Sequence, residues 1–328
     1  MEREAGLQDD EELTPVRSRR RLVGYAVGVA AGVGGLVVAF PAVAGAPWAA
    51  VAAALASVPT GAMLTLVLVW AAGLAAHTIT LTAALPGLTH RRALLLSLTG
   101  SAVANVMPLG GAAGVALNYR MTRRWGFSPA CFAGYTVVSN LWDVVAKLVL
   151  PAVLVPLVLL GLPVPAGLQH VLLAAAVALP LVVVGAAFVL ANPRAVARFG
   201  ARVERARRVS GGVVRAGWRR LSIGMAGYTV LLFLLLQACL LVTGAGVPWQ
   251  VVLVAFCVER LATLVGLTPG GLGLVELGLA GALLLAPGAN AAAVAAAVLI
   301  YRALTFGLEI PVGGLLLLGW TWRQRVAA

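Results

Sequence analysis

Long apolar stretches without formal charge are the feature that most constrains this chain. No Asp, Glu, Lys or Arg lies between Arg21 and Arg91. Across all 328 residues, 61% are hydrophobic and 11% are charged, whereas a soluble domain is about 45–50% apolar and about 25% charged. A soluble globular protein is therefore excluded, and so is a disordered chain, which needs low hydrophobicity. The composition predicts an all-α polytopic membrane protein, and the length allows about six full spans of ~20 residues.

Basic residues gather in short segments between the apolar stretches. The chain has 24 Lys and Arg against 11 Asp and Glu, a formal net charge of +13. Such clusters are typical of cytoplasmic loops. We therefore expect a multi-pass protein of the cytoplasmic membrane with a cytoplasmic N-terminal tail at 1–21, a cytoplasmic basic segment at 194–220 and a cytoplasmic C-terminus. Nucleic-acid binding, another common reason for a basic chain, is rejected because the charges flank apolar spans.

The basic segment is expected to contain a helix that lies along the membrane surface. Arginines recur on one face of its helical pattern and apolar side chains recur on the other, as in interfacial amphipathic helices. The run Ser210-Gly211-Gly212 is expected to end this helix before the next span begins. A second short interfacial helix is expected at Trp48–Ala56.

One apolar segment, at 93–119, is interrupted in its middle by Pro108, Gly110 and Gly111. Arginines lie on both sides of this segment, so both of its ends are expected on the cytoplasmic side. A single span cannot satisfy this requirement, whereas a re-entrant hairpin of two half-helices can. We therefore predict a re-entrant hairpin over these residues.

A second segment, at 251–286, is interrupted in the same way by Pro269, Gly270 and Gly271. Uncharged loops flank it, so both of its ends are expected outside. Glycine allows the backbone to approach a ligand closely, and the free N–H groups at the start of a half-helix favour an anion. The residues at both breaks are therefore candidate substrate ligands.

The two interrupted segments divide the membrane part into similar halves, 22–161 and 168–322. Each half is expected to hold two spans, a hairpin and a further span, and the loop charges give the halves opposite orientations. The expected full spans lie at about 22–40, 62–85, 128–160, 168–190, 221–243 and 291–320. The predicted fold is about six full spans plus two re-entrant helical hairpins arranged as an inverted repeat, as in many secondary transporters. The alternative is a set of kinked spans whose glycines serve close packing.

Seven charged side chains fall within the expected membrane region. Each costs roughly 2.5–3.5 kcal/mol at a helix centre on insertion scales, so these groups must pair or face water. They are Asp143, Lys147, Glu259, Arg260, Glu276, Arg302 and Glu309. Two interpretations stay open for each residue: a structural ion pair between helices, or a ligand of the substrate or of a coupling ion.

Sequence spacing suggests partners for some of these charges. Asp143 and Lys147 are four residues apart on one helix face, and Arg302 and Glu309, seven apart, also share a face. Glu276 falls in the first turns of a half-helix, where the helix dipole stabilises a carboxylate.

The functional interpretation is favoured for three of the charged residues, Arg260, Glu276 and Arg302, because they flank or oppose the second break. Glu259 is expected to neutralise Arg260, and Glu309 is expected to be a structural partner nearer the cytoplasmic end.

Polar uncharged residues in the spans are weaker candidates. Asn105, three residues before the first break, is expected to cap freed backbone or contact a ligand. Asn140, Tyr135 and Tyr301 are similar candidates, and His77 is either a proton site or a hydrogen-bonded structural residue. The three cysteines lie in apolar stretches without metal-ligand spacing, so neither a metal site nor a cofactor is predicted.

The residues around the second break resemble those of a known family, the transmembrane, flippase-like domain of lysylphosphatidylglycerol synthases and its stand-alone relatives. The most specific match is Pro269-Gly270-Gly271-Leu272-Gly273 followed by Glu276, with Arg260 before it and Tyr301-Arg302 after it. Asn105, Pro108, Gly110 and Gly111 form a looser match, and the resemblance covers about residues 20–322. It implies translocation of a charged or lipid-linked headgroup between leaflets. The soluble aminoacyl-transferase domain of the full-length synthases does not follow here, so that activity is expected to be absent.

The leading functional prediction is a lipid flippase or transporter of a lipid-linked intermediate that works by alternating access. The glycine-rich breaks with Arg260 and Arg302 would hold a phosphate, while Glu276 and Asp143 would bind a headgroup amine or a coupling proton. The expected partners are membrane lipids and a separately encoded lipid-modifying enzyme. Two alternatives stay open: a transporter of small soluble anions, and a non-transporting partner of an envelope-lipid enzyme. An intramembrane enzyme is disfavoured, because the sequence contains no Ser/His/Asp set, metal cluster or P-loop.

Overall fold

The computed structural model describes residues 27, 30, 33–107, 110–159, 161, 164, 166–194, 200–265 and 269–326. Within these residues the chain is helical and contains no strand, which confirms the all-α prediction for this part of the protein. Three elements depart from α-helical geometry: η1 and η3 are π turns and η2 is a 3-10 turn. The elements are η1 (Gly35–Ala39), α2 (Phe40–Ala44), α3 (Trp48–Ala56), α4 (Thr60–Ala84), α5 (His90–Val106), α6 (Gly110–Arg124), α7 (Pro129–Leu159), α8 (Ala166–Ala191), α10 (Ala201–Val242), α11 (Trp249–Val265), η2 (Pro269–Gly271), α12 (Leu274–Leu283), α13 (Ala291–Arg302), η3 (Ala303–Gly307) and α14 (Glu309–Val326).

Five helices in the described residues are long and apolar enough to cross a membrane. A sixth candidate is the pair Leu36–Ala44 and Trp48–Ala56, whose axes bend by 83°. The polytopic prediction is therefore confirmed, although the first part of the expected first span, 22–40, is described only at residues 27, 30 and 33 onwards. The five long spans are Thr60–Ala84, Pro129–Pro156, Leu172–Ala191, Val203–Val242 and Ala291–Arg325.

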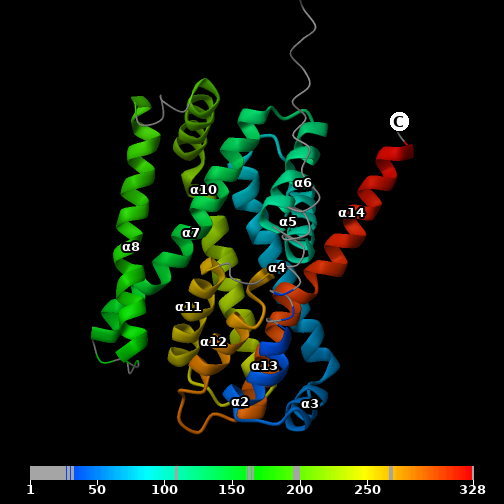
Figure 1. Ribbon diagram of the computed structural model, residues 1–328, viewed down its shortest axis with the longest axis vertical. Coiled ribbons are helices and arrows are strands. Elements are labelled where there is room, and N and C mark those ends of the chain that lie inside the picture. Colours follow the sequence, from blue (N-terminus) through cyan, green and yellow to red (C-terminus); the bar gives the residue numbers. More distant parts are fainter. Residues whose placement is uncertain are drawn as a thin grey trace, which may run out of the picture.

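The arginine-rich ends of the helices lie together at one end of the molecule, the upper end in Figure 1. Helices α5 and α10 begin there, and α6 and α14 end there. Arg124 at the end of α6 donates to Gln324 Oε1 of α14 at 2.8 Å, and its guanidinium lies 5.8 Å from the ring centroid of Trp320. The basic clusters thus gather as the loop charges predicted, while the side of the membrane that this end occupies stays a prediction.

Two pairs of short helices occupy opposite halves of the molecule. Helices α5 and α6 pack together in the upper half of Figure 1, and α11 and α12 pack together in the lower half. Helix α10 runs between the halves and packs against α4, α7, α11 and α13. Helix α13 is enclosed, since every residue from Ala293 to Val298 is buried. Its small alanine side chains let neighbouring helices approach closely, which is how apolar helices associate in lipid.

The helix in the basic segment does not end where the sequence suggested. Helix α10 continues through Ser210-Gly211-Gly212 into the fifth expected span, so the predicted helix end at this run is wrong. Ser210 is buried, and its hydroxyl donates to the Ala206 carbonyl at 2.9 Å. Each helical glycine costs roughly 0.5–1 kcal/mol relative to alanine, and packing of α10 against α4 and α7 offsets this cost.

The contact between α14 and α5 depends on a glycine, and this dependence can be tested. A Cβ atom at Gly313 would lie 2.1 Å from the Leu98 carbonyl oxygen, whereas one at the adjacent Gly314 would meet nothing within 4 Å. Gly313→Ala must push α14 away from α5, so we expect a loss of about 1–3 kcal/mol, typical of overpacking. Thermal unfolding of the purified protein in detergent measures this loss.

Gly314→Ala is the matched control for this experiment. It places the same side chain one residue further along α14, where alanine is simply the better helix former. Its midpoint of unfolding should equal or exceed that of the parent. Equal midpoints for Gly313→Ala and Gly314→Ala would contradict the described packing of α14 on α5.

Candidate functional site

The two helix breaks contact each other, although Val106 and Met107 at the first break and Gly270 at the second are exposed. The last turns of α5 contact η2, and a Cβ atom at Gly270 would lie 3.1 Å from the Asn105 side-chain oxygen and 2.0 Å from the Phe306 ring. Gly270 also has φ +60°, a conformation that side-chain-bearing residues rarely adopt. Glycine is therefore required at this position, and Asn105, expected to act at the first break, lies against the second.

The first break brings α6 directly beside the end of α5. A Cβ atom at Gly110 would fall 1.6 Å from the Ala104 carbonyl oxygen, so only glycine allows α6 to begin there. Gly111 is exposed and lines a pocket described below. Pro108, the other residue predicted at this break, lies outside the described residues, and Pro269 begins η2 at the second break.

A buried ion pair holds the second break to α13. Glu276, 2% exposed, accepts a hydrogen bond from the Gly273 backbone N–H at 2.6 Å and another from Arg302 Nε at 2.7 Å. Arg302 in turn donates through Nη2 to the Gly270 carbonyl at 2.8 Å. Glu276 occupies the third position of α12, which confirms the expected placement of a carboxylate at a half-helix start. These side chains satisfy backbone groups that the break leaves without helical partners.

The partner of Arg302 differs from the one that its spacing suggested. Arg302 pairs with Glu276, whereas Glu309 begins α14 and faces Ser101 of α5. The π turn η3 lies between Arg302 and Glu309, and its i→i+5 bonding pattern shifts the helical register. Residues seven apart therefore no longer share a face, and the suggested Arg302–Glu309 pairing is corrected.

A second pair lies on α11. Arg260 donates through Nε and Nη2 to both carboxylate oxygens of Glu259, which is fully buried. This contact confirms that Glu259 neutralises Arg260. Arg260 Nη2 also lies 3.5 Å from the Tyr301 hydroxyl of α13, so this pair connects α11 to the helix that carries Arg302.

The third pair, on α7, extends these pairs into a row of charges across the bundle, although its Asp143 side chain is 40% exposed. Lys147 Nζ lies 2.7 Å from Asp143 Oδ2, as the four-residue spacing predicted. A cavity of about 10 Å³ separates this pair from Tyr228 of α10 and Arg260 of α11, which is room for about one water molecule. Within the described residues, the row therefore runs from α7 past α10 to α11 and α13.

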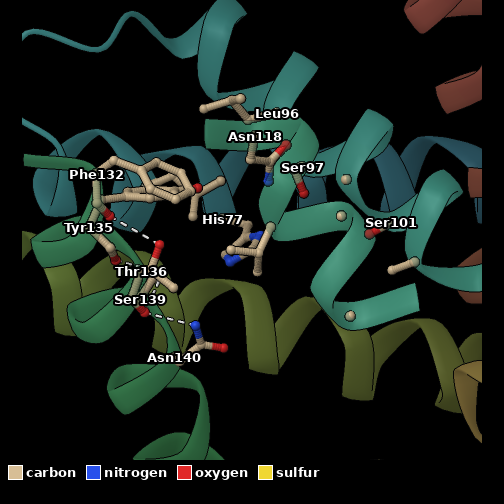
Figure 2. Close-up of a pocket in the computed structure, with 16 residues that line it drawn as sticks. His77, Leu96, Ser97, Ser101, Asn118, Phe132, Tyr135, Thr136, Ser139 and Asn140 are labelled. Atoms are coloured by element: carbon tan, nitrogen blue, oxygen red, sulfur yellow. Dashed lines mark hydrogen bonds between the residues drawn. The ribbon is translucent and has the colours of Figure 1, made fainter. Parts of the chain in front are cut away.

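A larger polar pocket of about 290 Å³ lies among α4, α5, α6 and α7. Figure 2 shows His77 near its centre, between hydroxyl and amide side chains of α7 on one side and of α5 and α6 on the other. None of the lining residues carries a formal charge, if His77 is neutral. The polar side chains that line it are His77, Ser97, Ser101, Asn118, Tyr135, Thr136, Ser139 and Asn140.

The sequence indicated part of this pocket and missed the rest. His77 on one span, and Tyr135 and Asn140 on another, were weak candidates, and the structure brings them together. Thr136, Asn118 and the serines were missed, because small polar side chains on apolar helices often only hydrogen-bond to their own backbone. A usable signal existed on α7, where polar residues recur every three or four positions from Tyr135 to Asp143 and mark one face of an otherwise apolar span.

An aromatic stack separates the polar pocket from the row of charges. The rings of His77 and Tyr228 lie 4.6 Å apart between centroids, with an interplanar angle of 17°. His77 lines the pocket, and Tyr228 lines the small cavity beside Asp143 and Arg260. Two polar compartments of the interior therefore share one wall, which is made by α4 and α10.

Fold and site together define a polytopic helical membrane protein with a polar pocket and paired charges inside an apolar bundle. The family model of the lysylphosphatidylglycerol synthase transmembrane region matches residues 22–313. The chain therefore belongs to this family, which suggests a membrane protein that handles lipid. No curated protein matches the chain.

Removing one member of the Glu276–Arg302 pair should destabilise the protein strongly. Arg302→Met leaves a buried carboxylate without its cation, and breaking a buried pair in this way costs about 3–5 kcal/mol. The double variant Glu276→Gln/Arg302→Met should recover part of that loss, because no charge is then left unpaired. Unfolding midpoints in detergent measure both changes.

Arg208→Met is the matched control for this prediction. Arg208 also faces a glutamate, Glu204, but at 3.9 Å and with a side chain that is 66% exposed. The contribution of such a surface pair is about 0–1 kcal/mol, so its loss should change little. A midpoint for Arg302→Met as high as that for Arg208→Met would show that the buried pair does not hold the break.

Proposed function

We propose that this protein is a lipid flippase that moves a phospholipid or a lipid-linked headgroup across the cytoplasmic membrane by alternating access. The observation that carries the proposal is the pocket with polar lining side chains among four apolar helices, which includes Ala104 and Gly111 beside the first break. A polar headgroup cannot cross a hydrocarbon core of about 30 Å without polar groups along its path. Buried polar groups in a membrane bundle are expensive and mark such paths.

The position of the pocket favours a lipid over a water-soluble substrate. Its rim includes two exposed residues, Val115 of α6 and Asn140 of α7. At 1.5 Å per helical residue, Asn140 lies about 16 Å along α7 from its start at Pro129, and Val115 lies about 14 Å before the end of α6 at Arg124. If the ends of these helices mark the membrane surface, the mouth would face the side of the bundle at hydrocarbon depth, where acyl chains could remain in the bilayer while a headgroup enters.

The proposal includes the predicted membrane topology. The α5–α6 and α11–α12 pairs would be re-entrant hairpins that enter from opposite leaflets and form an inverted repeat. Their placement in opposite halves of the molecule supports this idea (Figure 1). Rocking of one half against the other around the meeting breaks would expose the pocket to each leaflet in turn.

The two arginines predicted to hold a phosphate would do so by exchanging their carboxylate partners for it. Arg260 and Arg302 already bind carboxylates, so a lipid phosphate would replace Glu259 or Glu276. Each carboxylate released in this way would be free to take a headgroup amine or a coupling proton, and Asp143 would do so by exchange with Lys147. The glycine-rich breaks would contribute backbone N–H groups to the same phosphate.

A transporter of small soluble anions is less well supported by this geometry. Within the described residues, the interior cations Lys147, Arg260 and Arg302 each have a carboxylate within 4 Å. The pocket itself holds no arginine or lysine. A soluble anion would therefore have to replace a carboxylate, as a lipid phosphate would, but without acyl chains to hold it at a lateral mouth.

Lipid exchange in proteoliposomes tests the proposal directly. The parent should speed the movement of an acyl-labelled fluorescent phospholipid between leaflets, measured by dithionite quenching of the outer leaflet. Arg260→Ala, Glu276→Gln and Arg302→Ala should each slow this exchange about tenfold or more, and Arg208→Ala should not. If all three variants move lipid like the parent, the assignment of the site is wrong.

Cysteine accessibility in sealed vesicles tests the topology. On a background without the native cysteines, Arg92→Cys and Arg120→Cys should react with an impermeant reagent from one side. Gln250→Cys and Gly288→Cys should react from the opposite side. If the two members of either pair emerge on different sides, that segment is a single span and the inverted repeat fails.

A further inference from the structure

The α7 wall of the polar pocket offers hydrogen-bond acceptors, because its hydroxyl groups donate to the backbone of their own helix. Thr136 Oγ1 donates to the Phe132 carbonyl at 3.0 Å, and Ser139 Oγ donates to the Tyr135 carbonyl at 2.8 Å. Because a hydroxyl has one hydrogen and two lone pairs, both groups can offer only lone pairs to a ligand. The hydroxyl side of α7 is therefore a set of hydrogen-bond acceptors, as the dashed lines in Figure 2 show.

Amide oxygens extend this acceptor surface. Asn140 donates through Nδ2 to the Thr136 carbonyl at 2.7 Å, which leaves its oxygen as an acceptor. Asn118 Oδ1, on the opposite wall, is buried and has no hydrogen-bond partner within the described part of the chain. A buried acceptor without a donor is unfavourable, so a ligand that supplies the donor would recover this free energy.

The donor that fits this pocket is a neutral one. None of the lining residues is acidic, and an ammonium group buried without a carboxylate is costly. Two acids lie near the lining without being part of it: Glu309 faces Ser101, and Asp143, which is paired with Lys147, acts on His77. The rings of Phe132 and Tyr135, whose centroids lie 6.0 Å apart, add an apolar surface for the carbon skeleton of a ligand.

Pocket size limits the ligand to a small group. Ligand pockets usually measure about 300–1,000 Å³, and this one, at about 290 Å³, lies at the lower limit. One glycerol, inositol or single sugar unit fits this description better than a longer chain of sugars.

We infer that the pocket among α4–α7 binds the headgroup of a lipid through neutral hydroxyl donors, so that polyol headgroups are preferred over headgroups with an ammonium. This inference rests on the proposed function, whose substrate class it specifies. Asn118, Thr136 and Ser139 accept hydrogen bonds from the headgroup hydroxyls, and the acyl chains leave through the mouth between α6 and α7.

Native mass spectrometry of the full chain in detergent tests this inference with four lipids that share the same acyl chains. Phosphatidylglycerol and phosphatidylinositol carry hydroxyl donors, phosphatidylethanolamine carries an ammonium, and phosphatidic acid carries neither. We expect the two polyol lipids to bind about tenfold more tightly than the other two. Equal or tighter binding of phosphatidylethanolamine overturns the inference.

Two variants locate the preference within the pocket. Thr136→Val replaces the hydroxyl by a methyl group of similar shape and should reduce the preference for polyol lipids about fivefold. Asn118→Leu should reduce it further. The matched control is Thr65→Val, since the Thr65 hydroxyl also donates to the carbonyl four residues earlier, at 3.0 Å, but lies on an exposed face of α4. An unchanged preference in Thr136→Val, in protein as stable as the Thr65→Val control, overturns the inference.

Two further outcomes separate this inference from the proposed function. Selective binding of polyol lipids without any exchange between leaflets would support the preference of the pocket for polyol headgroups and would contradict the proposed flippase activity. Rapid exchange of all four lipids at equal rates, unaffected by Thr136→Val, would support the proposed flippase activity and would contradict the preference of the pocket for polyol headgroups. Binding of free inositol as tight as that of phosphatidylinositol would show that the ligand is a soluble polyol, and this result would overturn the lipid assignment.

Discussion

The hydrogen bonds of Glu276 are the interaction on which the centre of this structure depends. Hydrocarbon offers no hydrogen bonds to a polypeptide, so irregular backbone at membrane depth must find its partners within the protein. The Glu276 carboxylate binds the Gly273 N–H and the Arg302 guanidinium, which in turn binds the Gly270 carbonyl. This closed set of contacts allows a helix to stop and restart in the interior, and it fixes α13 against the break. The remaining polar features of the site are arranged around this junction.

Pairing also explains how so much charge is tolerated inside an apolar bundle. Each interior cation described here has a carboxylate beside it, either on its own helix or on the next one. The net charge of the row is therefore small, and its cost to the fold is well below the sum for isolated charges. A charged group that enters this region can therefore replace one member of an ion pair, because each cation and carboxylate there is already paired. The uncharged pocket on the other side of the His77–Tyr228 stack is a separate environment, which suits hydroxyl and amide hydrogen bonding.

The sequence predicted those features that follow from local patterns. Apolar length and loop charge located the long spans, and the Pro-Gly-Gly run and the four-residue spacing of Asp143 and Lys147 located a break and an ion pair. The sequence did not predict the path of α10 through Gly211-Gly212, because packing against α4 and α7 outweighs helix propensity there. The prediction that Arg302 and Glu309 share a helix face was wrong, because a π turn lies between them and the hydrophobic pattern does not reveal such a turn. The pocket was only partly predicted, since its polar residues are spread over four helices and gain meaning only when those helices pack together.

The two breaks are chemically different, although their sequences are alike. At the second break, a buried acid and a buried base bind the backbone of η2 and α12 directly. At the first break, α5 and α6 meet through glycines, with Asn105 and the pocket's hydroxyl and amide groups nearby. The two regions therefore differ in chemistry: paired charges bind irregular backbone in α11–α13, whereas neutral side chains line the pocket of α4–α7. In the proposed function, the pocket would recognise the headgroup and the paired charges would exchange partners at the junction.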